Sequence, residues 1–235
     1  MHNPWVELPL RNPYILEMDC DSINRYTERV AEDEKINFRS IPEPFIGNPT
    51  SATVILLNLN PGDSPEDAKA HNDPAVRSAM IRNLGHELWD YAFYPLNPAF
   101  AWTPVAKWRT QRLRTLFDEG GLDRACVAQR LCVIEWFPYH SRKAGLPIKP
   151  VCPSQAYSFE IAQQMLGKKL VVGMRAEKRW SEVDQKFANI PYLKNHQCCH
   201  VSPGNTRGTL FSEIVDALRC GGCSQPEITK QSLPK

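Results

Sequence analysis

Short runs of apolar residues alternate with segments of helical periodicity along most of the chain. The apolar runs are residues 54–59, 131–137, 169–173 and 197–201. Helical patterns are expected at residues 75–91, 104–117, 123–130, 154–166, 176–187 and 209–219. Strands that alternate with helices predict a parallel sheet covered on both faces. The expected fold class is therefore α/β, a three-layer α/β/α arrangement around a central, mostly parallel four-stranded sheet.

The first fifty residues follow a different pattern. Residues 21–33 are a polar helix candidate, and residues 39–52 ("RSIPEPFIGNPTSA") are punctuated by proline. Proline cannot donate to a strand ladder, so this second stretch is expected to be an irregular strap that leads into the sheet. The predicted organisation is an N-terminal helix and strap over residues 1–50, one α/β domain over residues 51–220, and a polar, flexible tail over residues 221–235.

Composition and charge narrow the class without naming a partner. The 235 residues carry a net charge of +2 and are 42% hydrophobic, which is ordinary for a globular protein and permits nucleic acid without requiring it. The sequence shows neither a secretion signal nor a run of about 18 apolar residues, so no membrane association is expected. The eight cysteines are then expected to be free thiols in a reducing compartment. These features predict a soluble, cytoplasmic monomer.

Unusual polar sequences follow the predicted strands: "NLNPGD", "EWFPYHS", "GMRAEKRW" and "HVSPGNTRG". The carboxyl ends of parallel strands meet at one edge of a sheet, where ligands of open α/β sheets bind. The first and last of these sequences place Pro-Gly directly before a helix, which aims backbone N–H groups at that edge and suits an anion or a phosphate. Pro-Gly also terminates strands without any function. The presence of Asn60 on one turn and His200 on the other favours a site.

These two turns are also the basis of a family resemblance. "NLNPG" at 58–62 and "HVSPGN" at 200–205 resemble the two signature motifs of the uracil-DNA glycosylase superfamily, most closely those of its mismatch-specific and single-strand-selective branches. The segment "VVGMRAEKRW" is similar to the penultimate strand and the following helix of that family, and residues 45–220 fit in all. The chain departs from the pattern at Asn58, where these branches usually have glycine, and at Val201, where they usually have proline.

The resemblance implies a monofunctional DNA glycosylase that hydrolyses the N-glycosidic bond of a flipped damaged or deaminated base. Asn60 would hold the water that attacks the sugar C1′, and His200 would donate a hydrogen bond to the base oxygen on which charge gathers. The implied partner is DNA, single- or double-stranded, and no cofactor is implied. The residues expected to contact DNA are Ser202, Gly204, Asn205, Arg207, Arg142 and Lys143.

The base itself is expected to meet residues of the strand ends: Asn58, Pro61, Gly62, Glu135, Tyr139 and His140. Well-studied relatives carry an asparagine on the middle strand to read uracil, whereas the nearest candidates here are Glu135 and His140. A carboxylate accepts hydrogen bonds, so it suits a base that presents amino or ring N–H donors and places uracil in doubt. Tyr139 is the favoured stacking residue, ahead of Trp136, Phe137 and Phe45.

Other interpretations stay open at this stage. A non-catalytic relative would bind a nucleic acid or a nucleotide in the same pocket, and Glu135 and Val201 favour considering it. A small-molecule hydrolase on a similar frame would need a nucleophile motif such as G-x-S-x-G, which the sequence lacks. A zinc site from Cys198, His200, Cys220 and Cys223 is not expected, because Cys220 lies at the far end of the last helix. The basic run 107–114 is interpreted as a solvated helix face.

Overall fold

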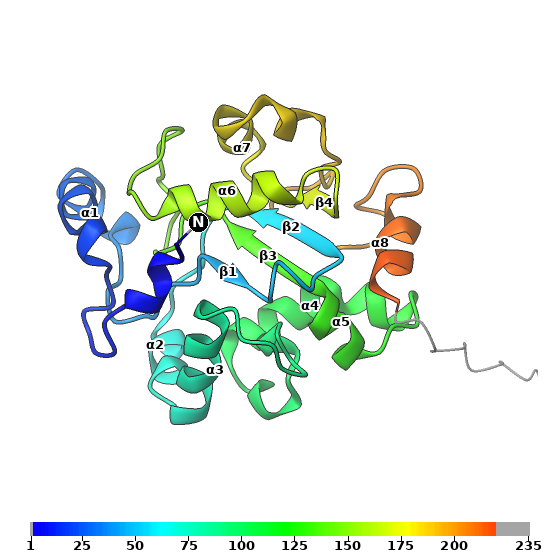
Figure 1. The fold of residues 1–235 in the computed structure, drawn as a ribbon, viewed down its shortest axis with the longest axis horizontal. Helices are drawn as coiled ribbons and strands as arrows, with labels where there is room; N and C mark the ends of the chain where they lie inside the picture. Colours follow the sequence, from blue (N-terminus) through cyan, green and yellow to red (C-terminus); the bar gives the residue numbers. More distant parts are fainter. Residues whose placement is uncertain (1, 220–235) are drawn as a thin grey trace, which may run out of the picture.

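The computed structural model describes residues 2–219, which form a mixed α/β fold around a four-stranded sheet (Figure 1). The strands are β1 (Phe45–Ile46), β2 (Val54–Asn58), β3 (Leu131–Glu135) and β4 (Leu170–Gly173), in the order β1-β3-β2-β4. β2 pairs in parallel with β3 and β4, and β1 pairs antiparallel with β3. Every residue of β2 and β3 is buried, as expected for parallel strands covered on both faces. The predicted α/β class and the mostly parallel sheet are confirmed.

One predicted strand is absent, and the strand Phe45–Ile46 was not predicted. Residues 197–201 form no strand, because the side chain of Asn195 takes up backbone donors that a strand would pair. Asn195 Oδ1 accepts hydrogen bonds from the backbone amides of Gln197 and Cys198. Cys199 also adopts a positive φ of 52°, which is incompatible with a ladder.

The remaining strand of the four-stranded sheet, β1, comes instead from the proline-rich strap. Proline lacks an N–H group but keeps its carbonyl, and the carbonyl of Pro44 accepts from the amide of Glu135 at 2.9 Å. β1 then runs into Gly47, which has a φ of 96°. A Cβ there would lie 2.3 Å from the carbonyl oxygen of Leu131, so only glycine allows this close approach.

Helices lie on both sides of the sheet, with α6 and α7 on one side and α2 to α5 on the other (Figure 1). Their bounds are α1 Cys20–Thr27, α2 Pro65–His71, α3 Pro74–Leu84, α4 Pro104–Asp118, α5 Arg124–Arg130, α6 Gln155–Met165, α7 Glu177–Val183 and α8 Leu210–Leu218. Short 3₁₀ helices lie at Pro4–Glu7, Glu17–Asp19, Glu32–Glu34, Tyr94–Leu96, Pro98–Phe100 and Gln185–Asn189. Within residues 2–219, no helix has the length and apolar character needed to cross a membrane.

The expected helices are present, but several end early. The helix predicted over 75–91 stops at Leu84, because Gly85 caps it and His86 adopts a φ of 55°. Leu88, which continued the apolar spacing, is 73% exposed. The N-terminal helix ends at Thr27 rather than near residue 33, and the helix expected over 176–187 is α7 followed by a separate 3₁₀ turn. The predicted tail, residues 221–235, lies outside the described residues.

Candidate functional site

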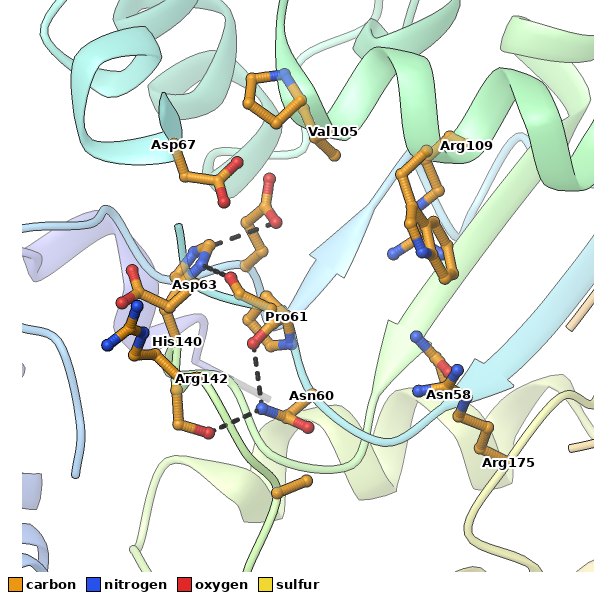
Figure 2. A pocket seen from close by; sticks show the side chains of 16 residues that line it. Asn58, Asn60, Pro61, Asp63, Asp67, Val105, Arg109, His140, Arg142 and Arg175 are labelled. Carbon is orange, nitrogen blue, oxygen red and sulfur yellow. Dashed lines mark hydrogen bonds and ion pairs between the residues drawn. The ribbon is translucent and has the colours of Figure 1, made fainter. Parts of the chain in front are cut away.

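The carboxyl edge of the sheet opens into a cavity of about 370 Å³ (Figure 2). Its wall combines the turn after β2, the segment 140–144 after β3, the first turns of α4, and residues of the strap and of α2. Asn58, Asn60, Pro61, Gly62, His140 and Arg142, all singled out from the sequence, line this cavity. The strand-end argument therefore located the pocket.

A buried network forms one side of the cavity. The parallel register places Asn58 opposite Glu135, and α4 brings Arg109 to the same carboxylate. Glu135 Oε1 accepts from Arg109 Nη2 at 2.8 Å and from Asn58 Nδ2 at 3.0 Å. The three residues are 0 to 4% exposed. The ion pair compensates both charges, since either one alone would be costly to bury.

Glu135 therefore has a different place from the expected one. Glu135 does not line the cavity. It is buried behind Asn58 and Arg109, and these two residues line the cavity instead. The interpretation of Glu135 as a direct contact to the base is corrected by this geometry: the carboxylate positions two lining residues.

Asn60 is held at the mouth of the β2 turn by its own amide nitrogen. Nδ2 donates to the carbonyl of Pro61 at 2.9 Å and to Ser141 Oγ at 3.1 Å (Figure 2). Ser141 is fixed in turn, because its hydroxyl donates to the carbonyl of Lys143. Among residues 2–219 the side-chain oxygen of Asn60, Oδ1, has no hydrogen-bond partner. It is therefore the group that this side chain offers to a ligand or a water.

His140 lines the cavity with both ring nitrogens engaged. Nδ1 lies 2.6 Å from the carbonyl oxygen of Gly62, and Nε2 lies 2.9 Å from that of Ile41. Glu43 Oε2 lies 3.9 Å from Nε2. His140 therefore ties the wall together and has no nitrogen left to read a base.

The environment of His140 shifts the pKa values of its neighbours. Burial raises the pKa of Glu43, and His140 and a hydrogen bond from Tyr94 partly oppose that rise. Burial lowers the pKa of His71 well below its usual range, and the charge of His140, whose ring lies 5.2 Å away, adds to this effect. His71 is therefore neutral, and its Nδ1 accepts from the amide of Ile41.

Charge is divided across the cavity. Asp63 and Asp67 lie on one side together with Arg142, whereas Arg109 and Arg175 lie on the other (Figure 2). Burial raises the pKa of Asp67, and a hydrogen bond from Ser64 works against that shift. The cavity can therefore meet a ligand with acceptors at one end and with cationic donors at the other.

The lining residues that were not singled out from the sequence include Trp108, Arg109 and Arg175. Trp108 and Arg109 belong to the basic run that was interpreted as solvated, and Arg175 follows β4. The guanidinium carbons of Arg109 and Arg112 lie 4.8 and 4.6 Å from the Trp108 ring centroid. One sequence signal could have indicated Trp108 and Arg109. The basic run is interrupted by an aromatic residue, and it lies in the first turns of a helix that starts at the edge of the sheet.

Arg175, which follows β4 and lines the cavity, is hydrogen-bonded to the loop of residues 196–199. Its Nε donates to the carbonyl of His196 at 2.9 Å, and its Nη2 donates to that of Gln197 at 2.7 Å. Nε also lies 2.8 Å from Cys199 Sγ. Arg175 thereby joins the pocket to the loop that carries the second sequence motif.

The second motif itself lies outside the lining. His200 is partly exposed, and its carbonyl accepts from Asn205 Nδ2 at 2.8 Å. Asn205 also accepts from the amide of Asn195 at 2.7 Å, so the loop is folded onto itself. The other expected DNA contacts on this loop, Ser202, Gly204 and Arg207, likewise do not line the cavity, and Lys143 is paired with Asp33.

The prediction that Tyr139 stacks on the base at the cavity rim is wrong. This residue was expected to face the rim, but it is 1% exposed and its hydroxyl donates to Asp19 Oδ2 at 2.6 Å. The Trp5 ring packs edge-on against it at 5.9 Å. Of the aromatic candidates, Trp136, Phe137 and Phe45 are also core residues, and the aromatic residue on the cavity wall is Trp108.

Cysteines contribute no metal centre in the part of the chain that the structure describes. Among residues 2–219, no group of three or more metal-ligating side chains could hold an ion. Cys220 and Cys223, which the weighed zinc arrangement required, lie outside this range. Five cysteines are free thiols: Cys20, Cys132, Cys152, Cys198 and Cys199.

Comparison with family models, with curated proteins and with solved structures finds no match for this chain. The resemblance to the uracil-DNA glycosylase superfamily therefore rests on the motif residues of the sequence.

Proposed function

We propose that this protein is a DNA glycosylase-like protein with the three-layer frame of the uracil-DNA glycosylase superfamily, acting as a monomer on a flipped damaged or deaminated base. The observation that carries the proposal is Asn60. The turn after β2 holds its amide nitrogen on Ser141 and leaves its carbonyl oxygen open beside a cavity of about 370 Å³. Cavities of this size enclose small organic ligands.

In this mechanism Asn60 orients a water toward the sugar C1′ of an extruded nucleotide. The C1′–N bond breaks, its electron pair leaves with the base, and the water oxygen bonds to C1′. An amide oxygen cannot take up the proton that the water loses, so the proton passes to a carboxylate of the lining, Asp63 or Asp67.

The base departs with developing negative charge, which is what the site must stabilise most. Arg109 and Arg175 lie on the lining, whereas His200, the donor implied by the family resemblance, lies outside it. The proposal therefore assigns this stabilisation to the arginines in the described conformation. It assigns strand contacts to Arg142 at the rim.

A strand-scission assay tests the proposal. Labelled single- and double-stranded oligonucleotides carry one uracil, hypoxanthine, xanthine or mismatched thymine, and alkali reveals the abasic site. We expect cleavage at one lesion and a loss on the order of 100-fold in Asn60→Ala, because the attacking water loses its position. Asn189→Ala removes an exposed asparagine remote from the cavity and serves as the matched control.

The second candidate is a binding protein on the same frame that performs no excision. The position of His200 outside the lining favours it. Binding of a lesion-containing strand without cleavage of any of the four lesions, at protein in excess over DNA, would support this candidate and would contradict the catalytic proposal.

A further inference from the structure

One end of the cavity carries carboxylates with oxygens that the protein leaves open. Glu43, Asp63 and Asp67 line this acidic end, and each keeps one oxygen that forms no hydrogen bond within residues 2–219. Arg142 lies on the same side, but within that range it forms no ion pair with any of the three. The other oxygen of each carboxylate already accepts a hydrogen bond, from Tyr94 in Glu43, from Asn37 in Asp63 and from Ser64 in Asp67.

Glu43 is the carboxylate that most needs a further donor. The residue is 5% exposed, and its open oxygen Oε2 is not fully enclosed, so a ligand in the cavity can reach it. His140 Nε2 lies 3.9 Å from Oε2, too far for a hydrogen bond, and 2.9 Å from the carbonyl oxygen of Ile41. Burial raises the pKa values of Glu43 and Asp67, because their charge is incompletely compensated. A ligand that donates hydrogen bonds here would supply the missing compensation.

The proposed reaction sets the order of a nucleoside along the cavity. In that reaction the leaving base meets Arg109 and Arg175, and C1′ faces the water that Asn60 holds. In the view of Figure 2, Asn60 lies between Asp67 on one side and the two arginines on the other. The sugar is bonded to the base through C1′, so it extends toward the acidic end.

The acidic end can accept hydrogen bonds from a ribose but not from the sugar of a DNA strand. A deoxyribose within a strand carries only hydrogen atoms on C2′, and its 3′ and 5′ oxygens are esterified, so it offers no donor. A ribose has a 2′ hydroxyl, which is both a donor and an acceptor. Carboxylates at the edge of open α/β sheets bind ribose hydroxyls in other nucleotide sites.

We propose that the acidic end binds the 2′ hydroxyl of a ribose, so that the substrate of the site is a ribonucleoside. This inference rests on the proposed function, because the proposed reaction sets where the sugar lies. Water is the only co-reactant: its oxygen bonds to C1′, the C1′–N bond breaks, and the proton passes through a lining carboxylate to the departing base. A free ribonucleoside and a ribonucleotide within an RNA strand are the two sources of this ribose.

Binding of C-nucleosides measures ribose recognition without turnover, because their carbon–carbon bond at C1′ is not hydrolysed. Pseudouridine and formycin B are compared with their 2′-deoxy counterparts by isothermal titration calorimetry. We expect each ribonucleoside to bind at least about tenfold more tightly than its 2′-deoxy counterpart, the effect of one hydrogen bond to a charged group. Release of ribose from uridine or inosine, lost in Asn60→Ala, should accompany this preference.

A second arm distinguishes the source of the ribose. Oligodeoxythymidine strands carry one central pseudouridine, with either ribose or deoxyribose, and their binding is measured by fluorescence anisotropy. A ribose preference among the free compounds identifies a free ribonucleoside, and a preference within the strand alone identifies RNA. Equal binding of ribose and deoxyribose in both arms, tighter binding of deoxyribose, or no binding in either arm would overturn the inference.

Two isosteric variants locate the hydroxyl. Asp67→Asn and Glu43→Gln each keep an oxygen for the existing hydrogen bond and replace the open acceptor with an amide donor, so at least one should lose the ribose preference. Glu66→Gln is the matched control, because Glu66 is an exposed carboxylate on the same helix as Asp67 and does not line the cavity. Retained preference in both cavity variants would contradict the assignment. Where neither variant folds, the comparison of ribose with deoxyribose in the unmodified protein still decides.

The two proposals fail separately. Excision from DNA that depends on Asn60, together with equal binding of ribose and deoxyribose, would keep the proposed function and overturn the ribose assignment. A ribose preference that depends on Glu43 or Asp67, without release of a base from DNA or from a ribonucleoside, would keep the assignment and contradict catalysis.

Discussion

Residues with ionisable side chains are partly or fully buried in several places outside the cavity, and His86 is one of them. Its ring stacks on Phe45 at 4.3 Å, and its Nε2 lies 2.8 Å from the hydroxyl of Tyr157. Burial lowers the pKa of His86 to about 4. The folded protein therefore holds this imidazole neutral at pH values where an unfolded chain already protonates it.

His86 should make the protein less stable in mild acid. Its stabilising contribution is complete above the unfolded pKa of about 6.5 and is lost as the pH falls from there toward 4. The variant His86→Asn places at this position a residue type that tolerates the positive φ. In this variant the free energy of unfolding should depend less steeply on pH between about pH 4 and 6.5, by up to about 1.4 kcal/mol per pH unit, because one titrating imidazole is removed. Urea titrations at several pH values measure it.

The exposed residue Asn189 provides the control, because Asn189→Ala changes no ionisable group and should leave the slope unchanged. His71, whose pKa is also lowered, continues to contribute in both variants. An identical slope in His86→Asn and in the unmodified protein would contradict the expected titration.

The candidate site was predictable only in part at this scale. Asn58, Asn60 and His140 were found because strand ends in a parallel sheet converge whatever the helices do. Arg109 was missed, because one cation within a basic run differs from its neighbours only by the buried carboxylate that it meets. Tyr139 was misplaced, because a position two residues beyond a strand does not determine whether the chain turns outward or back into the core.

The helices α2, α3 and α4 start with strong local signals. Ser64, Asp73 and Thr103 cap α2, α3 and α4, and each cap is followed by a proline at the first helical position. These signals explain why the start of α4 agrees with the prediction. The end of α3 at Gly85 and the loss of the strand at 197–201 could not be predicted equally well, because both depend on contacts that form only in the folded chain.

Thr103 is expected to be the most important cap for the cavity wall. Its hydroxyl accepts from the amide of Ala106 and donates to the carbonyl of Phe100, and the residue is 1% exposed. Thr103→Val preserves the shape but removes both hydrogen bonds, so the free energy of unfolding should fall by about 1–2 kcal/mol. Urea denaturation measures this loss.

The same substitution at Thr50, which is exposed, should change the free energy of unfolding by less than about 0.5 kcal/mol. If both valine variants are equally stable, the Thr103 hydroxyl does not hold the start of α4.

The whole molecule carries a net charge of only +2, so its overall field attracts DNA weakly. The proposed binding to a strand must then depend on a few local contacts near the cavity mouth. Arg142 lies on the cavity lining, whereas Arg124 on α5 precedes the amino end of β3, at the opposite edge of the sheet.

Arg142→Ala should weaken binding of a single-stranded oligonucleotide regardless of its sequence. The slope of log K against log salt should become shallower by roughly 0.7, the value for one lost phosphate contact on a single strand. Anisotropy titrations between low and moderate salt measure the slope. Arg124→Ala should leave it unchanged, and equal changes in the two variants would show that strand contacts are not localised at the cavity mouth.

Arg175 contributes both to the cavity wall and to the anchoring of residues 196–199. Any ligand that draws this guanidinium toward itself competes with the carbonyls of His196 and Gln197, and any event that frees those carbonyls changes the guanidinium available to the ligand. Occupancy of the cavity and release of the loop are therefore thermodynamically linked, and each must alter the equilibrium of the other by the same factor.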